Sequence, residues 1–158
     1  WDARWEEFSR WAERGQAVKD QLVRLVDEDT LAFNRVMAAL ASPKGTDAEK
    51  AARAAALEAA NLGALEVPWQ VMKTAFGAFE LLRAMAEHGN PASASDAGVG
   101  ALCTRAAIRG AWLNVRTNAS GIKNKAVIAE IVSQASRLEE AAAIQEAEIL
   151  AIVEQKFS

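Results

Sequence analysis

Apolar residues recur three or four positions apart along almost the whole chain, within segments rich in alanine. This is the spacing of one face of an α-helix, and no stretch shows the strict alternation or the Val, Ile and Thr clusters that half-buried strands need. The 158 residues are the length of one domain, and no linker, repeat or change of composition divides them. The sequence therefore predicts a single all-α domain over residues 1–158, a bundle of four to five long helices.

Start and stop signals divide the chain into four helical segments. The expected helices are Ala3–Leu40, Asp47–His88, a segment from Ser93 or Ser95 to about Ala119, and about Lys125–Gln155. Thr46 followed three residues later by Glu49 is typical of a capping box at a helix start. Pro68 removes a backbone donor and crowds the preceding turn, so the second segment is predicted to be kinked or broken there.

Charge and composition exclude several classes of function. With a formal net charge of -3, the chain lacks the concentrated basic face that binding to nucleic acid needs. No apolar run is long enough to span a membrane, and the first residues lack the features of a secretory signal. Cys103 is the one cysteine and His88 the one histidine, which argues against a disulfide and against a His-based metal site. These features predict a cytoplasmic protein that binds no metal, no nucleic acid and no membrane.

The third predicted helix carries a face of small side chains with polar groups at both ends. Steps of three and four residues along it give Asp96, Gly100, Cys103, Ala107, Gly110, Asn114 and Asn118. Such a face allows another backbone or a ligand to approach closely, and a tight helix crossing at a symmetric dimer interface is one explanation. Gly100 and Gly110 are expected at points of contact, within the most buried helix of the fold.

Two carboxylates are candidates for chemistry. In the first predicted helix, one face is expected to be buried, and the apolar residues on this face include Leu22, Leu25, Val26, Phe33, Val36 and Leu40. Asp29 falls on the same side by helical spacing, so it is predicted to point inward, where it either pairs with an arginine or acts as a general acid or base. Asp96 is near a helix start, where a carboxylate is either a cap or a second acid or base.

A cluster of donors follows on the third helix. NVRTN, at residues 114–118, holds the amides of Asn114 and Asn118 with the guanidinium of Arg116 between them. These groups either form a structural hydrogen-bond network or bind a carboxylate, a pterin-like ring or a developing anion. The pattern alone leaves both alternatives open.

Three motifs, in this order, resemble those of the formimidoyltetrahydrofolate cyclodeaminase and methenyltetrahydrofolate cyclohydrolase family, which includes the C-terminal domain of formiminotransferase-cyclodeaminase. They are DEDTLAF at Asp27–Phe33, GNPASASDAG at Gly89–Gly98 and NVRTN at Asn114–Asn118. The resemblance covers nearly the whole chain. Family members also begin with a PxPGGGS-like segment and an alanine-rich helix that ends near MVANL, and neither is present here. We therefore expect that these 158 residues lack the glycine-rich segment and the first helix of the family domain.

The resemblance implies an activity and partners. It implies a cyclodeaminase that closes 5-formimino-tetrahydrofolate to 5,10-methenyltetrahydrofolate and releases ammonia, a step of histidine degradation, with no cofactor beyond the folate substrate. The alternatives are a methenyltetrahydrofolate cyclohydrolase and a non-catalytic helical dimerisation module. It also implies a homodimer or a higher homo-oligomer that binds folate, including polyglutamylated folate, near the subunit contact, and an association with a formiminotransferase.

The same resemblance suggests a role for each candidate residue. Asp29 and Asp96 are the expected catalytic acid and base, because ring closure needs a base for the N10 proton and an acid for the departing amine. Asn114, Arg116 and Asn118 are expected to orient the substrate. Lys44 and Lys123 are expected to bind its anionic glutamate tail.

Overall fold

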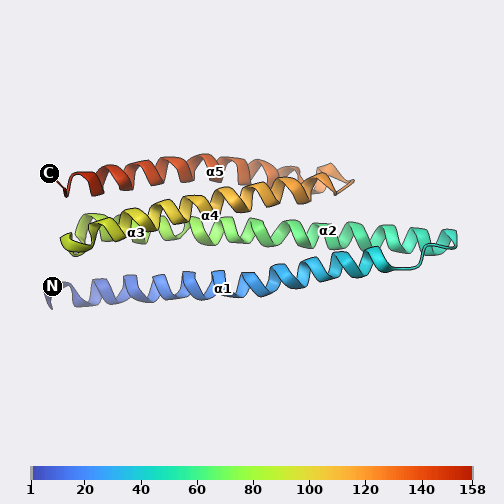
Figure 1. Cartoon of the computed structure of the whole chain (residues 1–158), viewed down its shortest axis with the longest axis horizontal. Helices are drawn as coiled ribbons and strands as arrows, with labels where there is room; N and C mark the ends of the chain where they lie inside the picture. The colour runs from blue at the N-terminus through green and yellow to red at the C-terminus, as the bar shows by residue number, and fades with distance from the viewer. Residues whose placement is uncertain (1, 158) are drawn as a thin grey trace.

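Long helices lie side by side along one axis of an elongated molecule (Figure 1). The structure, a computed structural model, describes residues 2–157. Its helices are α1 (Trp5–Ala41), α2 (Asp47–Phe76), α3 (Ala78–His88), α4 (Ala94–Ser120) and α5 (Lys125–Glu154), with short 3-10 turns at Asp2–Arg4 and Pro91–Ser93. No strand occurs within residues 2–157, and the all-α prediction is confirmed. None of the described helices is both long and apolar enough to span a membrane.

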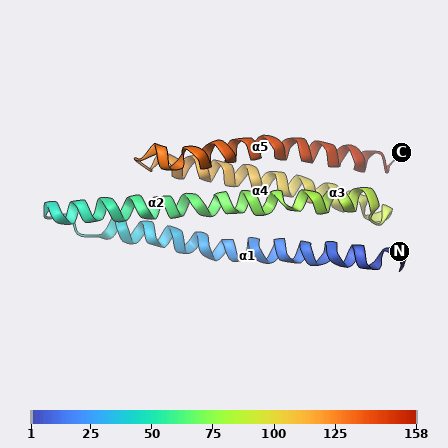
Figure 2. The ribbon, with the colours of Figure 1, turned by 180° about the vertical axis from the view of Figure 1, so that it is seen from behind.

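The helices pack as a row with α1 at one side and α5 at the other. α1 lies on α2, and α4 packs against both α2 and α5, while α3 extends α2 beneath α4 (Figures 1 and 2). The chain reverses between α1 and α2, between α3 and α4, and between α4 and α5. As a result α1 and α4 run in the same direction, and both chain ends lie at one end of the bundle.

The start of α2 has the predicted capping box. The Thr46 hydroxyl accepts a hydrogen bond from the Glu49 backbone N–H at 3.2 Å, and the Glu49 carboxylate accepts one from the Thr46 N–H at 2.8 Å. Both contacts satisfy donors that the first helical turn leaves unpaired, which fixes where the helix begins.

Pro68 lies inside α2 without ending it, so of the two alternatives predicted there, a kink or a break, the break is wrong. A proline has no N–H, which leaves the carbonyl of Ala64 without its helical donor. The side-chain amide of Asn118, on α4, donates to that carbonyl oxygen at 2.6 Å. The helix ends instead at Phe76, and α3 begins after Gly77. A donor from a neighbouring helix thus replaces the hydrogen bond that the proline removes.

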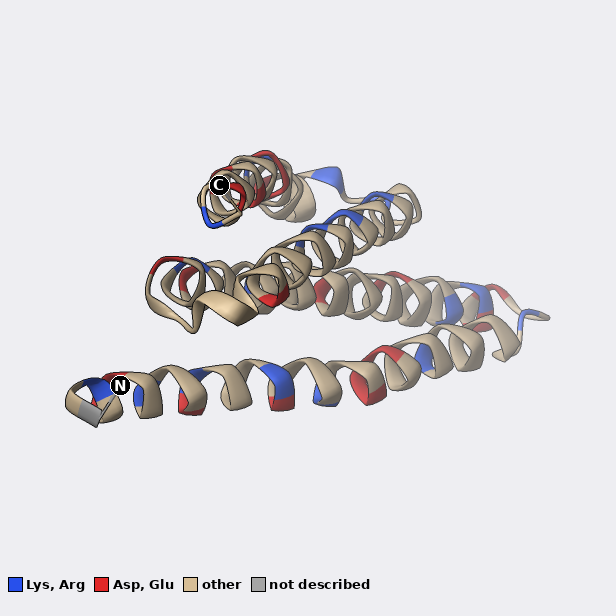
Figure 3. Ribbon diagram, turned by 60° about the vertical axis from the view of Figure 1, so that its left-hand side comes forward, with Lys and Arg blue, Asp and Glu red and all other residues tan. Residues whose placement is uncertain are grey.

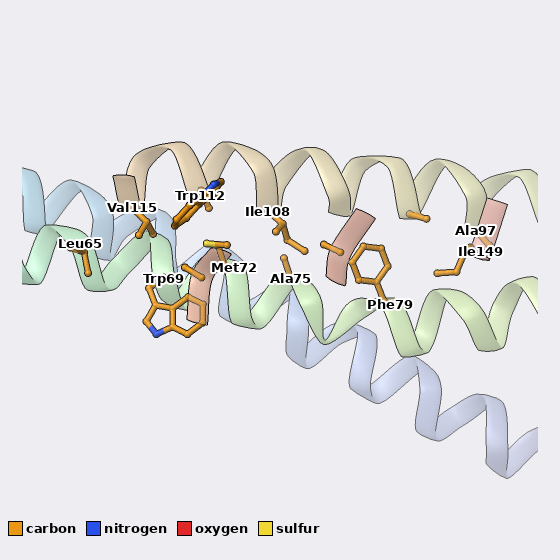
Figure 4. Close-up of a cluster of buried hydrophobic side chains, with 14 of the residues drawn as sticks. Leu65, Trp69, Met72, Ala75, Phe79, Ala97, Ile108, Trp112, Val115 and Ile149 are labelled. Carbon is orange, nitrogen blue, oxygen red and sulfur yellow. The ribbon is translucent and has the colours of Figure 1, made fainter. Parts of the chain in front are cut away.

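The main core lies between α4 and the continuous row of α2 and α3 (Figure 4). Its fully buried large side chains include Leu65, Met72, Phe79, Ile108, Val115 and Ile149. Alanines of α4 and α5 separate these residues and let the helices approach closely. The third helix predicted from sequence, α4, is accordingly a central element of the bundle.

α1 has two apolar stripes, and only one of them is covered. Leu25, Ala32 and Ala39, seven residues apart, are buried against α2. Val26 and Phe33 are 65% and 61% exposed, although they were predicted to share the buried side. The prediction treated both stripes as one face, whereas α1 contacts its neighbours through a narrow strip. α1 therefore presents an apolar surface that no described residue covers.

Gly89 is required by close contact rather than by backbone conformation. It ends α3 at φ -70° and ψ -177°, which any residue can adopt. A Cβ at this position would overlap the backbone carbonyl of Met85, which cannot move without unwinding the last turn of α3. We expect Gly89→Ala to lower the free energy of unfolding by about 1–3 kcal/mol in urea titrations.

Gly110→Ala is the matched control for this substitution. A Cβ at Gly110 would have no atom within 4 Å, so the change should be neutral or stabilise the helix by up to about 1 kcal/mol. Equal unfolding free energies for the two variants would contradict the contact with Met85.

An ion-pair cluster joins α4 to α5. The Oε1 atom of Glu139, which is 8% exposed, accepts hydrogen bonds from Arg105 at 2.7 Å and from Arg109 at 2.8 Å. Burial raises the pKa of Glu139, but the hydrogen bonds from the two arginines outweigh this effect, and the pKa is lowered overall. Ionised Glu139 therefore stabilises the fold at neutral pH.

The stability that ionised Glu139 contributes to the fold should be lost in acid. Because the folded-state pKa lies below the ordinary value of 4.5, stability should fall as the pH drops from that value through the folded-state pKa. We expect Glu139→Gln to lower Tm at pH 7 and this difference to disappear in acid. Glu140→Gln, at the exposed neighbouring residue, is the control. A Tm difference for Glu139→Gln that is constant across the pH range would contradict the argument.

Candidate active site

Asp96 lines a small pocket where the chain turns from α3 into α4. The pocket has a volume of about 280 Å³, and its lining residues are Leu81, Leu82, Met85, Gly89, Asn90, Ser93, Asp96 and Ala97. Asp96 lies in the first turn of α4, the only acidic residue there, and the arginines of α4 lie further along the helix (Figure 3). The pocket is thus lined by the carboxylate of Asp96, the amide of Asn90 and the hydroxyl of Ser93 together with apolar side chains, and its volume suits one ring system of a ligand.

Asn90 helps to shape this turn. Its side-chain oxygen accepts a hydrogen bond from the Ala92 N–H at 3.0 Å, which starts the 3-10 turn that leads into α4. Neither Asn90 nor Ser93 was predicted from the sequence to be a site residue. Both lie in the GNPASASD motif, and the signal that could have identified them was the number of polar side chains in so short a reversal.

Asp29 is exposed, and the prediction that it points into the core is wrong. By helical spacing it follows Leu22 and Val26, which line an apolar groove between α1 and α4. It forms no ion pair or hydrogen bond with any residue in 2–157, so the alternative of a salt bridge is not realised. Asp29 itself is not among the residues that line this groove.

The groove itself is mainly apolar. It has a volume of about 530 Å³, and the large side chains that line it include Val18, Leu22, Val23, Val26, Leu81 and Leu82, with Gly100 and Cys103 from α4. Leu81 and Leu82 also line the Asp96 pocket, so the groove and the pocket adjoin one another.

The three polar residues of NVRTN do not gather at one point. Residues two apart on a helix face different sides, and the structure separates Arg116 from the two asparagines accordingly. The guanidinium of Arg116 lies 6.0 Å from the centre of the Trp112 ring. Asn118 binds the carbonyl of Ala64, which supports the structural alternative for this residue, and Asn114 is exposed.

The candidate residues are spread along the bundle. Asp96 and Asn114 are 18 positions apart on one helix, which corresponds to about 27 Å. Leu81 lies against Gly15 of α1 and Leu82 against Gly100 of α4, so these two glycines are level along the axis. Asp29 is 14 residues beyond Gly15 on α1, and it therefore lies more than two turns, over about 11 Å, beyond Asp96 along the axis. Within one chain, Asp29 and Asp96 therefore do not face the same small pocket.

The two lysines lie in the loops at the end of the bundle opposite the Asp96 turn (Figure 1). Lys44 follows α1, and Lys123 precedes α5. The backbone N–H of Lys123 donates to the Glu58 carboxylate at 3.0 Å, and the N–H of Asn124 does so at 3.1 Å, which caps the start of α5. Neither lysine is placed to meet a ligand held in the Asp96 pocket.

Comparison with known proteins shows the family to which this chain belongs. Residues 1–137 match the family described as formiminotransferase-cyclodeaminase, and the chain belongs to that family. It is 37% identical over 135 residues to a methenyltetrahydrofolate cyclohydrolase from Methylorubrum extorquens, a match that covers 85% of this chain and 65% of the relative. It is 35% identical over 137 residues to a formimidoyltransferase-cyclodeaminase from Gallus gallus, covering 87% of this chain and 25% of that protein.

A solved structure shares the fold. Formiminotetrahydrofolate cyclodeaminase from Thermotoga maritima superimposes with a TM-score of 0.74 at 23% identity, covering 99% of this chain and 72% of that one. The family predicted from the three motifs and the all-α fold predicted from the apolar spacing are thus confirmed. The chain spans about two thirds of the length of the cyclohydrolase and a quarter of the chicken protein.

Proposed function

We propose that this domain is a formimidoyltetrahydrofolate cyclodeaminase, which closes 5-formimino-tetrahydrofolate to 5,10-methenyltetrahydrofolate with release of ammonia. The observation that carries the proposal is the position of Asp96, a carboxylate beside a ring-sized pocket in a chain of this family. Small-molecule sites commonly measure about 300–1,000 Å³, so the pocket suits the reacting end of a folate rather than the whole molecule.

The chemistry requires the movement of two protons. N10 attacks the formimino carbon and forms the new C–N bond, and N10 then loses its proton. The amino group of the tetrahedral intermediate gains a proton and leaves as ammonia, which yields the methenyl bridge. One carboxylate beside the intermediate can accept the first proton and donate the second. We assign this role to Asp96, with the amide of Asn90 and the hydroxyl of Ser93 available to orient the folate ring.

A specific observation also favours a second candidate, the methenyltetrahydrofolate cyclohydrolase reaction. A relative that bears this name is 37% identical to the chain. In that reaction water adds to the methenyl carbon and the ring opens, so the same carboxylate would act on water instead of on the amine. The two reactions share 5,10-methenyltetrahydrofolate, as the product of one and the substrate of the other.

Two assays with the purified protein separate these candidates. In the first, 5-formimino-tetrahydrofolate is supplied, and the absorbance of the methenyl product is expected to rise faster than in the uncatalysed reaction. In the second, 5,10-methenyltetrahydrofolate is supplied, and a cyclohydrolase would speed the loss of the same absorbance. A third measurement is the Tm with a folate analogue, because a ligand that binds the folded state raises it. No rate above background in either assay and no rise in Tm would favour a non-catalytic module.

A further inference from the structure

Two neighbouring leucines of α3 form the wall between the Asp96 pocket and the groove. Among the described residues, Leu81 and Leu82 are the two that line both hollows. Both side chains are partly exposed, and α3 contacts α1 on one side and α4 on the other. The positions of these two side chains therefore determine how much of the space between the helices belongs to the pocket.

Each of these leucines lies against a glycine of another helix. A Cβ at Gly100 would lie 2.5 Å from the Cδ2 atom of Leu82, and a Cβ at Gly15 would lie 3.1 Å from the Cδ2 atom of Leu81. Carbon atoms in contact are normally about 3.5–4.0 Å apart, so a methyl group at position 100 requires Leu82 to move. The contact predicted at Gly100 is thus confirmed. The contact predicted at Gly110 is wrong, since a Cβ there would meet no atom within 4 Å in residues 2–157.

The backbone of α4 does not require a glycine at position 100. Gly100 lies inside the helix, and no glycine in the described part of the chain has a positive φ. Glycine destabilises a helix relative to alanine, because it loses more conformational freedom on folding. The three atoms nearest to a Cβ at this position all belong to Leu82. The contact with Leu82 is therefore the feature of the fold that a glycine at position 100 serves.

The contact also determines the direction in which Leu82 would move. Gly100 lines the groove and not the Asp96 pocket, so a methyl group at position 100 would approach Leu82 from the groove side. The end of the leucine side chain would then turn away from the groove and into the pocket. The pocket has a volume of about 280 Å³, at the lower limit of about 300 Å³ that is usual for small-molecule sites. It therefore has little space to lose.

We propose that Gly100 determines the size of the ligand that the Asp96 pocket accepts, because it leaves Leu82 enough space to stay out of the pocket. Leu82 lines the pocket, and Gly100 acts through Leu82, so Gly100 is a positioning residue. The inference rests on the proposed function for the chemistry of the ligand, which is the reduced pterin ring of a folate. With alanine at position 100, the pocket should no longer hold the two fused rings.

The methionine methyl groups provide a test that needs no ligand. Met85 lines the pocket, whereas Met72 is fully buried in the main core and Met37 is 48% exposed on α1. With methyl-labelled methionine, we expect Gly100→Ala to shift the NMR resonance of Met85 by more than its line width and to leave the other two in place. Gly110→Ala is the matched control and should shift none of the three. A Met85 resonance that does not change in Gly100→Ala would overturn the proposal.

A double variant tests whether the effect passes through Leu82. The atom that meets the new methyl group is at the end of a flexible side chain, so Gly100→Ala should fold. In a chain that already carries Leu82→Ala, there is no branched side chain to displace. Adding Gly100→Ala to that chain should therefore leave the Met85 resonance where Leu82→Ala alone places it. A further shift in the double variant would overturn the proposal.

Binding of 5-formyl-tetrahydrofolate, a stable analogue of the proposed substrate, tests the consequence for the ligand. We expect its Kd to rise at least tenfold in Gly100→Ala and to stay within twofold of the parent in Gly110→Ala. With 5-formimino-tetrahydrofolate, KM should rise with a smaller change in kcat, because Gly100 acts on binding rather than on the reacting atoms. Equal affinities of the parent and Gly100→Ala would overturn the proposal. A parent that does not bind the analogue would contradict the proposed function instead, and the Met85 resonance would still decide whether Gly100 controls the pocket.

Discussion

Replacing Asp96 with asparagine should lower the rate of formation of 5,10-methenyltetrahydrofolate by about 10²- to 10⁴-fold, the usual loss when a general acid or base is removed. Asparagine has nearly the shape of aspartate, and Asp96 is exposed, so the fold should be retained. The amide cannot accept the N10 proton or protonate the departing amine. Steady-state kinetics should show the loss in kcat, with a smaller change in KM, because the substituted group acts on the intermediate.

Asp29→Asn and Asp20→Asn are the comparisons for this variant. Asp20 is an exposed carboxylate of α1 without a proposed role, and its substitution should leave the rate unchanged. Asp29 lies more than two turns from Asp96 along the bundle, so any effect of its substitution should combine additively with that of Asp96→Asn. A parent-like rate for Asp96→Asn would remove this residue from the mechanism.

Truncating Phe79 to alanine should lower the free energy of unfolding by about 3–5 kcal/mol. Phe79 is 1% exposed, and it packs edge-to-face on Phe76 with ring centres 5.7 Å apart. It lies on α3 in the core beneath α4 (Figure 4), where the neighbouring helices cannot collapse into the space of a lost ring. Urea unfolding monitored by circular dichroism measures the change.

The control is Phe33→Ala, which removes the same side chain from an exposed position instead of a buried one. Its ring is 61% exposed on α1, so Phe33→Ala should change stability of the 158-residue chain by no more than about 0.5 kcal/mol. Similar losses for the two variants would contradict the exposed position of the Phe33 ring.

The sequence was sufficient for the helices because their signals are local. The Thr46 and Glu49 box and the turn at residues 89–91 depend on residues a few positions apart, and both are present in the structure. The break considered at Pro68 does not occur, and the donor that compensates for the proline comes from Asn118, 50 positions away. No local pattern contains that information.

The site was harder to predict for a related reason. Helical spacing identified the small-residue face of α4 that includes Asp96 and Asn114, and the structure confirms that these positions share a face. Spacing could not show which apolar stripe of α1 is buried, so Asp29 was assigned to the core. The contact of Arg116 with Trp112, by contrast, joins residues four positions apart on one helix, and helical spacing alone could have predicted it.

The contact between Asn118 and the carbonyl freed by Pro68 constrains how this sequence can change. With alanine at position 68, the carbonyl of Ala64 would recover its helical N–H, and Asn118 could be replaced at little loss. With proline at position 68, loss of the Asn118 amide leaves a partly buried acceptor unpaired, which costs about 1 kcal/mol. An asparagine at position 118 is therefore expected to have arisen before the proline, and the proline now makes the asparagine difficult to lose. A relative that keeps the proline without a donor at position 118 should prove less stable than one that lacks both.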